Sequence, residues 1–219
     1  RDSVKYLLGL ARQPAIERDY SSTVVEKALS LPSAQVYIKN NALEYQKREG
    51  YCSVATQRCV ANSILTFPTS KIPPIEKSGP STALSFAEKL TNEDCCRSTT
   101  VYGSEGYDAF RKTLMKANQA DRYRVAVNFL RSSLFGIRPP TFLVSSWCLA
   151  LAGGHFSPIL GYLEEEDLVV IFDVNHNYGF FLCDSKRLFD SVNTVDIVHP
   201  DGYTRGLIVT EILHEKKKN

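Results

Sequence analysis

The first part of the chain places its apolar residues at the spacing of amphipathic helices. In "SSTVVEKALSL", Ser and Thr residues precede apolar positions at Val25, Ala28 and Leu29, which is typical of a capped helix. The segments "KSGPSTALSFAEKL" and "GYDAFRKTLMKANQADRYRVAVNFLRSSL" continue this pattern. The stretch "FPTSKIPPIEKSGP" is rich in proline and glycine, so we expect a loop there. The pattern therefore predicts a largely helical region up to about residue 138.

After Pro139 and Pro140 the pattern changes to short apolar runs separated by turn-forming residues. These runs are "TFLVSSWCLAL", "HFSPILGYL", "DLVVIFDV", "TVDIVHP" and "RGLIVTEIL". A helical region followed by a sheet region is typical of α+β proteins. We expect one domain over residues 1–219, in which a helical lobe (about 1–138) packs on a lobe with an antiparallel β-sheet (about 139–213), with a cleft between them.

The composition is that of an ordinary globular protein, with 43% hydrophobic residues, 23% charged residues and a net charge of +2. So little net charge gives no reason to expect nucleic acid or a membrane surface as a partner. No apolar run approaches the ~20 residues of a membrane span. We expect a cytoplasmic protein. The chain begins at Arg1 rather than at a methionine, so a removed signal peptide and a periplasmic or secreted location stay open.

Six cysteines are too few for a disulfide scaffold in a chain of this size, and no CxxC pair occurs. We expect reduced and mostly buried thiols. Cys95 and Cys96 lie next to Asp94, but a closed zinc site needs a second pair of ligands at suitable spacing, and none is present. We therefore expect no metal site in the protein.

One cysteine, Cys52, stands where a helix is expected to begin, in "YQKREGYCSVATQRCVANSI". Apolar residues recur at helical spacing from this cysteine until Pro68 ends the pattern. The dipole and free N–H groups of a helix N-terminus stabilise a thiolate. Cys59 lies two turns further along and is expected in the core. Cys52 is thus a candidate nucleophile, and the alternative is a small buried residue.

A histidine and an aspartate are predicted to lie near each other across a hairpin. The turn "LEEED" separates two expected strands, and His155 and Asp173 lie at equal distances from residue 164 inside that turn. Facing residues of a hairpin have Cβ atoms about 5 Å apart, which permits a carboxylate–imidazole hydrogen bond. Such a pair can serve as a general base and the group that orients it. The alternative is a half-buried histidine bonded to a turn carbonyl. His176, His199 and His214 lie in loop or tail contexts, where surface or loop roles are expected.

The chain order Cys, His, Asp, with the cysteine on a helix and the other two on a sheet, is that of papain-like enzymes. Such an enzyme also needs a hydrogen-bond donor for the tetrahedral oxyanion. In papain-like enzymes the donors include a glutamine shortly before the nucleophile, and here Gln46 lies six residues before Cys52. The alternative for Gln46 is a surface amide.

These segments resemble a known family, the phytochelatin synthases and their shorter bacterial relatives. The family's "YCG.AS" run leading to "LNAL" corresponds here to "YCSVATQRCVANSI". Its "GHFSPIGGY", followed by a hairpin and "ILDVA", corresponds to "GHFSPILGYLEEEDLVVIFDVN". The paired cysteines of "NEDCCRS" and the end strand "RGLIVTEI" also resemble family segments.

The resemblance implies a papain-like fold and an acyl-enzyme mechanism on glutathione. Cys52 would attack the carbonyl of the Cys–Gly bond, His155 would act as base, Asp173 would orient His155, and Gln46 would stabilise the oxyanion. The resulting γ-glutamylcysteinyl thioester would pass to a second glutathione or to water. No cofactor is needed for the acyl-enzyme step. Cadmium, zinc or copper would enter as metal–glutathione thiolates or as activators, and a homodimer stays open.

The sequence departs from the family pattern at two positions near the site. Ser53 replaces the glycine after the nucleophile, and His176 replaces an arginine usual three positions past the aspartate. An arginine is a fixed partner for carboxylates, and glutathione presents free carboxylates to be held. Because this arginine is replaced, we expect poorer use of a second glutathione, so that hydrolysis competes strongly with transfer. Two other functions remain as alternatives: a papain-like peptidase acting on other peptides or isopeptides, and a non-enzymatic protein that binds metals or thiols.

Overall fold

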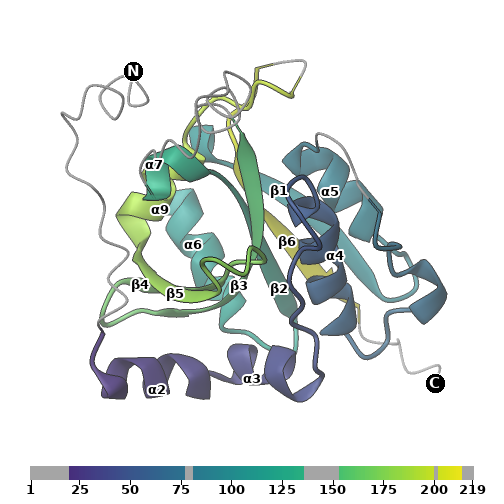
Figure 1. Cartoon of the computed structure of the whole chain (residues 1–219), viewed down its shortest axis with the longest axis horizontal. Helices are drawn as coiled ribbons and strands as arrows, with labels where there is room; N and C mark the ends of the chain where they lie inside the picture. Colours follow the sequence, from purple (N-terminus) through teal and green to yellow (C-terminus); the bar gives the residue numbers. More distant parts are fainter. Residues whose placement is uncertain (1–19, 77–80, 136–152, 200–201, 214–219) are drawn as a thin grey trace.

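The structure, a computed structural model, describes residues 20–76, 81–135, 153–199 and 202–213. Its centre is an antiparallel six-stranded sheet with the strand order β1-β6-β2-β3-β4-β5 (Figure 1). The strands are β1 (Cys96–Tyr102), β2 (Tyr123–Leu130), β3 (Gly154–Leu163), β4 (Leu168–Phe172), β5 (Phe180–Asp184) and β6 (Gly206–Ile212). The helices are α2 (Ser22–Ser30), α3 (Pro32–Lys39), α4 (Cys52–Asn62), α5 (Ala83–Leu90), α6 (Tyr107–Ala117), α7 (Arg131–Phe135) and α9 (Ser185–Val192), with 3₁₀ turns η1 (Thr69–Lys71) and η2 (Gly103–Glu105).

Helices cover both faces of the sheet. Figure 1 shows α6 and α9 on one side and α4 and α5 on the other. On strand β2, Val125 and Val127 pack in the core beneath α6 and α9, whereas Ala126 packs in the core beneath α4 and α5. A third cluster joins α2, α3 and α4 to strands β3, β4 and β5. The sheet is therefore the middle layer of three, and its central strands are buried on both faces.

Several local predictions are confirmed. Helix α2 starts after Ser21, whose hydroxyl accepts a hydrogen bond from the Val24 N–H, and α5 starts after a capping box at Thr82. Helix α4 begins at Cys52. The hairpin of β3 and β4 and the end strand β6 form where apolar runs predicted them. The α+β class and the antiparallel sheet are thus confirmed.

The prediction of a helical region before residue 138 is wrong in two places, because β1 and β2 both belong to the sheet. Strand β2 pairs with β3 and β6, and its apolar Val125, Val127 and Phe129 alternate with Arg124, Ala126 and Asn128. The prediction missed this period of two because the run follows the helical pattern of residues 106–117 with no Gly or Pro between them. The proposed boundary near residue 138 therefore does not separate helices from strands. The single domain over residues 1–219 stays a prediction.

The strand predicted in "TVDIVHP" is also wrong, since it forms one isolated bridge from Val195 to Thr204 instead. Here the alternating pattern did not lead to a strand, and Ile197 and Val198 are exposed. The run "TFLVSSWCLAL" lies outside the described residues. None of the described helices has the length and apolar character that spanning a membrane requires.

Gly103 allows η2 to pack directly on the end of α9. A Cβ at this position would lie 2.6 Å from Asn193 Cα and 2.9 Å from the Val192 carbonyl oxygen, both backbone atoms. We expect Gly103→Ala to lower the free energy of unfolding by about 1–3 kcal/mol, because the backbone must shift to admit the methyl group. Urea unfolding measures this. Ser104→Ala, at the exposed next position, is the matched control, and equal stability of the two variants would contradict the close approach.

Candidate active site

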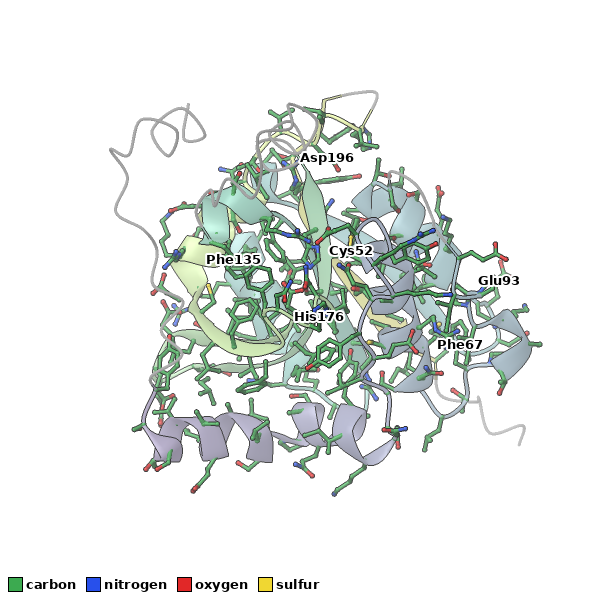
Figure 2. The ribbon with its side chains drawn as sticks, viewed as in Figure 1. Cys52, Phe67, Glu93, Phe135, His176 and Asp196 are labelled. Atoms are coloured by element: carbon green, nitrogen blue, oxygen red, sulfur yellow. The ribbon has the colours of Figure 1, made fainter. Side chains whose placement is uncertain are left out.

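Cys52 is the first residue of α4. The preceding Tyr51 provides no side-chain cap, and Gly50 makes the turn before it with a φ of 86°. The first-turn N–H groups of α4 are therefore not capped by a side chain, and they point toward the cysteine end of the helix. Figure 2 shows Cys52 near the centre of the molecule, between α4 and the sheet. The residue as a whole is partly exposed.

The electrostatics around Cys52 favour its thiolate. Burial raises the pKa of this thiol, but the charge of His155 and a hydrogen bond with its ring, together with the Phe156 backbone and the charge of Arg131, bring the pKa below its ordinary value. Cys59, on the same helix, is buried, and burial raises its pKa to about 12. The prediction that Cys59 lies in the core is confirmed, whereas the role of Cys52 as nucleophile stays a prediction.

His155 and Asp173 form the predicted hydrogen bond. His155 Nε2 lies 2.7 Å from Asp173 Oδ1, and the two side chains are 1% and 0% exposed. Asp173 Oδ1 also accepts a hydrogen bond of 2.7 Å from the Asn175 N–H. The alternative of a histidine bonded only to a turn carbonyl is thus excluded. The imidazole has one nitrogen committed to Asp173, which leaves Nδ1 for the chemistry.

The pairing register differs from the predicted one, although the contact is the same. Ile159 pairs with Ile171, whereas Gly161 pairs with Val170, so the register shifts between them. Continued from Ile159, this register sets Ser157 opposite Asp173, two residues from His155. The side chains therefore meet diagonally rather than face to face, which the reach of both side chains permits.

His155 is poised to hold a proton next to Cys52. Burial lowers the pKa of His155, but the Asp173 carboxylate and the Cys52 thiolate outweigh burial and the opposing charge of Arg131, and raise the pKa to about 9. With the pKa of Cys52 lowered, a thiolate–imidazolium pair is favoured near neutral pH. The arrangement can therefore provide a nucleophile and an acid in neighbouring positions.

Gln46 lies against the same site from the loop before α4. Its backbone N–H donates a hydrogen bond of 2.7 Å to the carbonyl of Val174, the residue after Asp173. The side chain is buried, and its Oε1 has no hydrogen-bond partner among the described residues. The alternative of a surface amide is excluded, whereas the oxyanion role of Gln46 stays a prediction.

An arginine that the sequence pattern did not single out completes the surroundings of His155. Arg131, the first residue of α7, places Nη2 2.8 Å from His155 Nδ1 and contacts the Glu49 carboxylate at 3.3–3.5 Å. Asn175 Nδ2 donates a hydrogen bond of 3.0 Å to the same carboxylate. A single arginine at the end of an apolar run carries no motif, so only the fold reveals it.

A second polar group missed by the sequence pattern lies beside Gly154, the residue before His155. Asn128 Nδ2 lies 3.3 Å from Asp196 Oδ2, and a Cβ on Gly154 would lie 3.0 Å from Asn128 Oδ1 and 3.2 Å from Arg205 Nε. The three side chains are buried. The Asp196 carboxylate and the Arg205 guanidinium thus form a buried negative and a buried positive group near the start of the strand that carries His155.

The remaining candidates are distributed away from this centre. His176 is exposed on the turn after Asp173, as expected, whereas His199 is buried and packs edge-on to Tyr102 and Tyr203. His214 lies outside the described residues. Cys95 and Cys96 are buried free thiols with sulfur atoms 3.8 Å apart. Within the described part of the chain, no three His, Cys, Asp or Glu side chains converge as metal ligands would.

Comparison with known proteins gives two matches. The family model described as phytochelatin synthase matches residues 74–207, more than half of the chain, which includes His155 and Asp173. A protein of Schizosaccharomyces pombe named glutathione gamma-glutamylcysteinyltransferase is 26% identical over 109 residues, which are 49% of this chain and 22% of that protein. This chain thus spans only about a fifth of that relative's length. The length of the family match nevertheless shows that the chain belongs to the phytochelatin synthase family.

Proposed function

We propose that this protein is a papain-like enzyme that cleaves the Cys–Gly bond of glutathione through a γ-glutamylcysteinyl thioester on Cys52. The observation that carries the proposal is the hydrogen-bonded pair His155–Asp173 beside a low-pKa cysteine at the start of α4. The printed name of the yeast relative, a glutathione gamma-glutamylcysteinyltransferase, supports glutathione as substrate. The sheet flanked by helices, with the cysteine on a helix, is compatible with a papain-like fold.

The first half-reaction needs one nucleophile and one proton donor. The Cys52 thiolate attacks the carbonyl carbon of the substrate cysteine and forms a C–S bond, and the carbonyl oxygen becomes an oxyanion. His155, protonated at Nδ1 by the Cys52 proton, gives that proton to the glycine nitrogen as the C–N bond breaks. Asp173 holds Nε2–H and so keeps Nδ1 directed at the reacting atoms. Glycine leaves, and the thioester remains.

Gln46 would stabilise the oxyanion together with the first-turn N–H groups of α4. Donors fixed before the reaction stabilise developing charge without reorganisation. The loop bond from Gln46 to Val174 ties this side chain to the segment that carries Asp173, which supports its placement in the site.

The amino-acid end of a γ-glutamyl group carries one ammonium and one carboxylate. Arg205 lies beside Gly154, and Asp196 accepts a hydrogen bond from Asn128, which also lies beside Gly154. These two buried side chains offer one guanidinium and one carboxylate for this pair of charges. Figure 2 shows Asp196 above Cys52 in that view, toward the end of the sheet where β3 begins. A glutamyl group bound there would extend toward His155, which follows Gly154 directly.

The thioester can be resolved in two ways. A second glutathione amine gives a longer γ-Glu-Cys chain, and water gives γ-glutamylcysteine. In either case His155 takes a proton from the attacking group. Cadmium, zinc or copper would act as metal–glutathione thiolates or activators. Because His176 replaces the usual arginine and is exposed, we propose that hydrolysis competes strongly.

Mass spectrometry of the products tests this function. The protein is incubated with glutathione, with and without cadmium or zinc, and with Ala-Cys-Gly, which has an α-linkage in place of the γ-glutamyl bond. We expect released glycine and γ-glutamylcysteine, with longer (γ-Glu-Cys) chains as the minor products, and little cleavage of Ala-Cys-Gly. Equal cleavage of both peptides would favour a general peptidase. No turnover, with metal uptake that survives Cys52→Ser, would favour a binding protein.

A further inference from the structure

The position of Arg131 beside His155 follows from strand pairing. In the register of β2 and β3, Phe129 pairs with His155 and Leu130 pairs with Gly154. Arg131 comes next, where β2 runs directly into α7 (Figure 1). The guanidinium therefore reaches the imidazole from the adjacent strand, and Nη2 lies 2.8 Å from Nδ1. This is the nitrogen that Asp173 leaves open.

The contact between Arg131 and His155 restricts the proton on the imidazole. A guanidinium has only donors, so Arg131 donates and His155 Nδ1 accepts. While the guanidinium lies at this distance, Nδ1 carries no proton and the imidazole is neutral, with its proton on Nε2 toward Asp173. The thiolate–imidazolium pair therefore requires the guanidinium to move away from Nδ1. Catalysis needs the same Nδ1 to take the proton of Cys52. Arg131 and the Cys52 proton therefore compete for one atom, and the guanidinium must turn away before His155 can act.

Arg131 also belongs to a set of donors shaped for a carboxylate. Its Nη atoms and Asn175 Nδ2 all point at the Glu49 carboxylate. Asn175 is buried and the Arg131 side chain is 26% exposed, whereas Glu49 is 67% exposed and held by arginine contacts of 3.3–3.5 Å. The donors are thus fixed and mostly buried, and their anion is a loosely held surface side chain. A better-placed carboxylate can displace Glu49.

The leaving residue of the substrate brings a carboxylate to this place. Its nitrogen must come within about 3 Å of His155 Nδ1 to receive the proton. Its carboxylate carbon lies two bonds further on, about 2.5 Å from that nitrogen. A guanidinium that already touches Nδ1 is therefore within reach of the carboxylate of a single C-terminal residue, whereas a longer leaving peptide would carry its carboxylate past it.

We propose that Arg131 and Asn175 bind the free C-terminal carboxylate of the substrate in place of Glu49. Binding draws the guanidinium off His155 Nδ1 and releases the base, so the site cleaves one residue from a free C-terminus. The inference rests on the proposed function and adds the group that selects for the terminal glycine. Arg131 contacts the substrate in this role and couples its arrival to the freeing of His155.

The test compares kcat/KM for glutathione and for its C-terminal amide in the same protein. Wild type is expected to prefer the carboxylate by at least roughly tenfold, the size of a charge-assisted hydrogen bond. Arg131→Met is expected to bring the preference close to one, and Arg131→Lys to keep part of it. Arg122→Met, which removes an exposed arginine at the other end of β2, is the matched control and should retain the preference. If Arg131→Met lowers kcat/KM for glutathione and for its amide by the same factor, Arg131 only supports the structure and the proposal is overturned.

Glu49→Gln tests the displacement step. It removes the charged group that competes with the substrate carboxylate for the Arg131 donors. We therefore expect a lower KM for glutathione, and we expect glutathione still to be preferred over its amide. An unchanged or raised KM would show that Glu49 does not occupy the substrate position.

A second readout does not depend on turnover. Cys52 is alkylated with N-iodoacetylglycine or with N-iodoacetylglycinamide, and the modified residue is identified by peptide mapping. The acid is expected to react faster than the amide in wild type and in Arg122→Met, and to lose this advantage in Arg131→Met. If glutathione is not cleaved but the advantage depends on Arg131, the proposed function fails and the carboxylate site stands. If glutathione is cleaved and neither ratio depends on Arg131, the inference fails and the function stands.

Discussion

Replacing Cys52 with serine is expected to lower kcat for glutathione cleavage by about 10⁴-fold or more, because a serine hydroxyl is not ionised in this site and no thioester can form. The hydrogen bonds and charges that lower the pKa of the thiol would act on an alcohol whose own pKa is far higher. Release of glycine, followed by amine derivatisation, measures the rate. Mass spectrometry of the intact protein, quenched in acid, shows whether the acyl-enzyme accumulates.

The control for this variant is Cys59→Ser on the same helix. Cys59 is buried, and burial raises its pKa to about 12, so its replacement is expected to leave kcat within a few-fold of wild type. Product formation by Cys52→Ser at a rate near that of wild type would show that another group is the nucleophile. A loss of activity in Cys59→Ser with unchanged folding would show that the helix carries a second reactive thiol.

Replacing His155 with alanine is expected to lower kcat by about 10²–10⁴-fold and to change the pH dependence of the cysteine. The imidazolium lowers the pKa of Cys52, so its removal must raise that pKa, and burial then acts with less opposition. In wild type, alkylation by iodoacetamide is expected to rise at a pH below the ordinary cysteine range. The imidazolium is lost as the pH passes about 9, where the pKa of His155 lies.

In His155→Ala the midpoint of alkylation should therefore move to higher pH. Rates of iodoacetamide alkylation between about pH 5 and about pH 10 give both profiles. His176→Ala, at an exposed histidine close to Asp173 in the chain, should keep the wild-type profile. Superimposable profiles for wild type and His155→Ala would contradict the thiolate–imidazolium pair.

The local parts of the site could be predicted from the sequence because they depend on neighbours in the chain. The helical spacing of apolar residues after Gly50 locates the start of α4 at Cys52, although the helix ends at Asn62 and not near Pro68 as the pattern predicted. The turn between β3 and β4 brings His155 and Asp173 together for the same reason. The predicted register is two residues off at Asp173, because the turn is centred between Glu165 and Glu166 rather than at Glu164. The shift between Ile159 and Gly161 reduces the difference from three residues to two.

The strand β2 was missed although Val125, Val127 and Phe129 alternate with more polar or smaller residues, because the run follows a helical pattern with no Gly or Pro between them. All seven residues from Arg124 to Leu130 are buried in the sheet. The long-range pairing of this segment with β3 and β6 shows that it is a strand. The same pairing delivers Arg131 to His155, so an error about β2 also hides Arg131.

The sequence by itself predicted the candidate nucleophile, the histidine–aspartate contact and the family, because each depends on a helix start, a hairpin or a short motif. The tertiary structure decided what surrounds them. Glu49 and Arg131 are 82 positions apart, and Asn128 and Asp196 are 68 positions apart, yet each pair meets at the site. Contacts of this kind follow from the strand order of the sheet, which local periodicity does not encode, and they decide which carboxylates the site can bind.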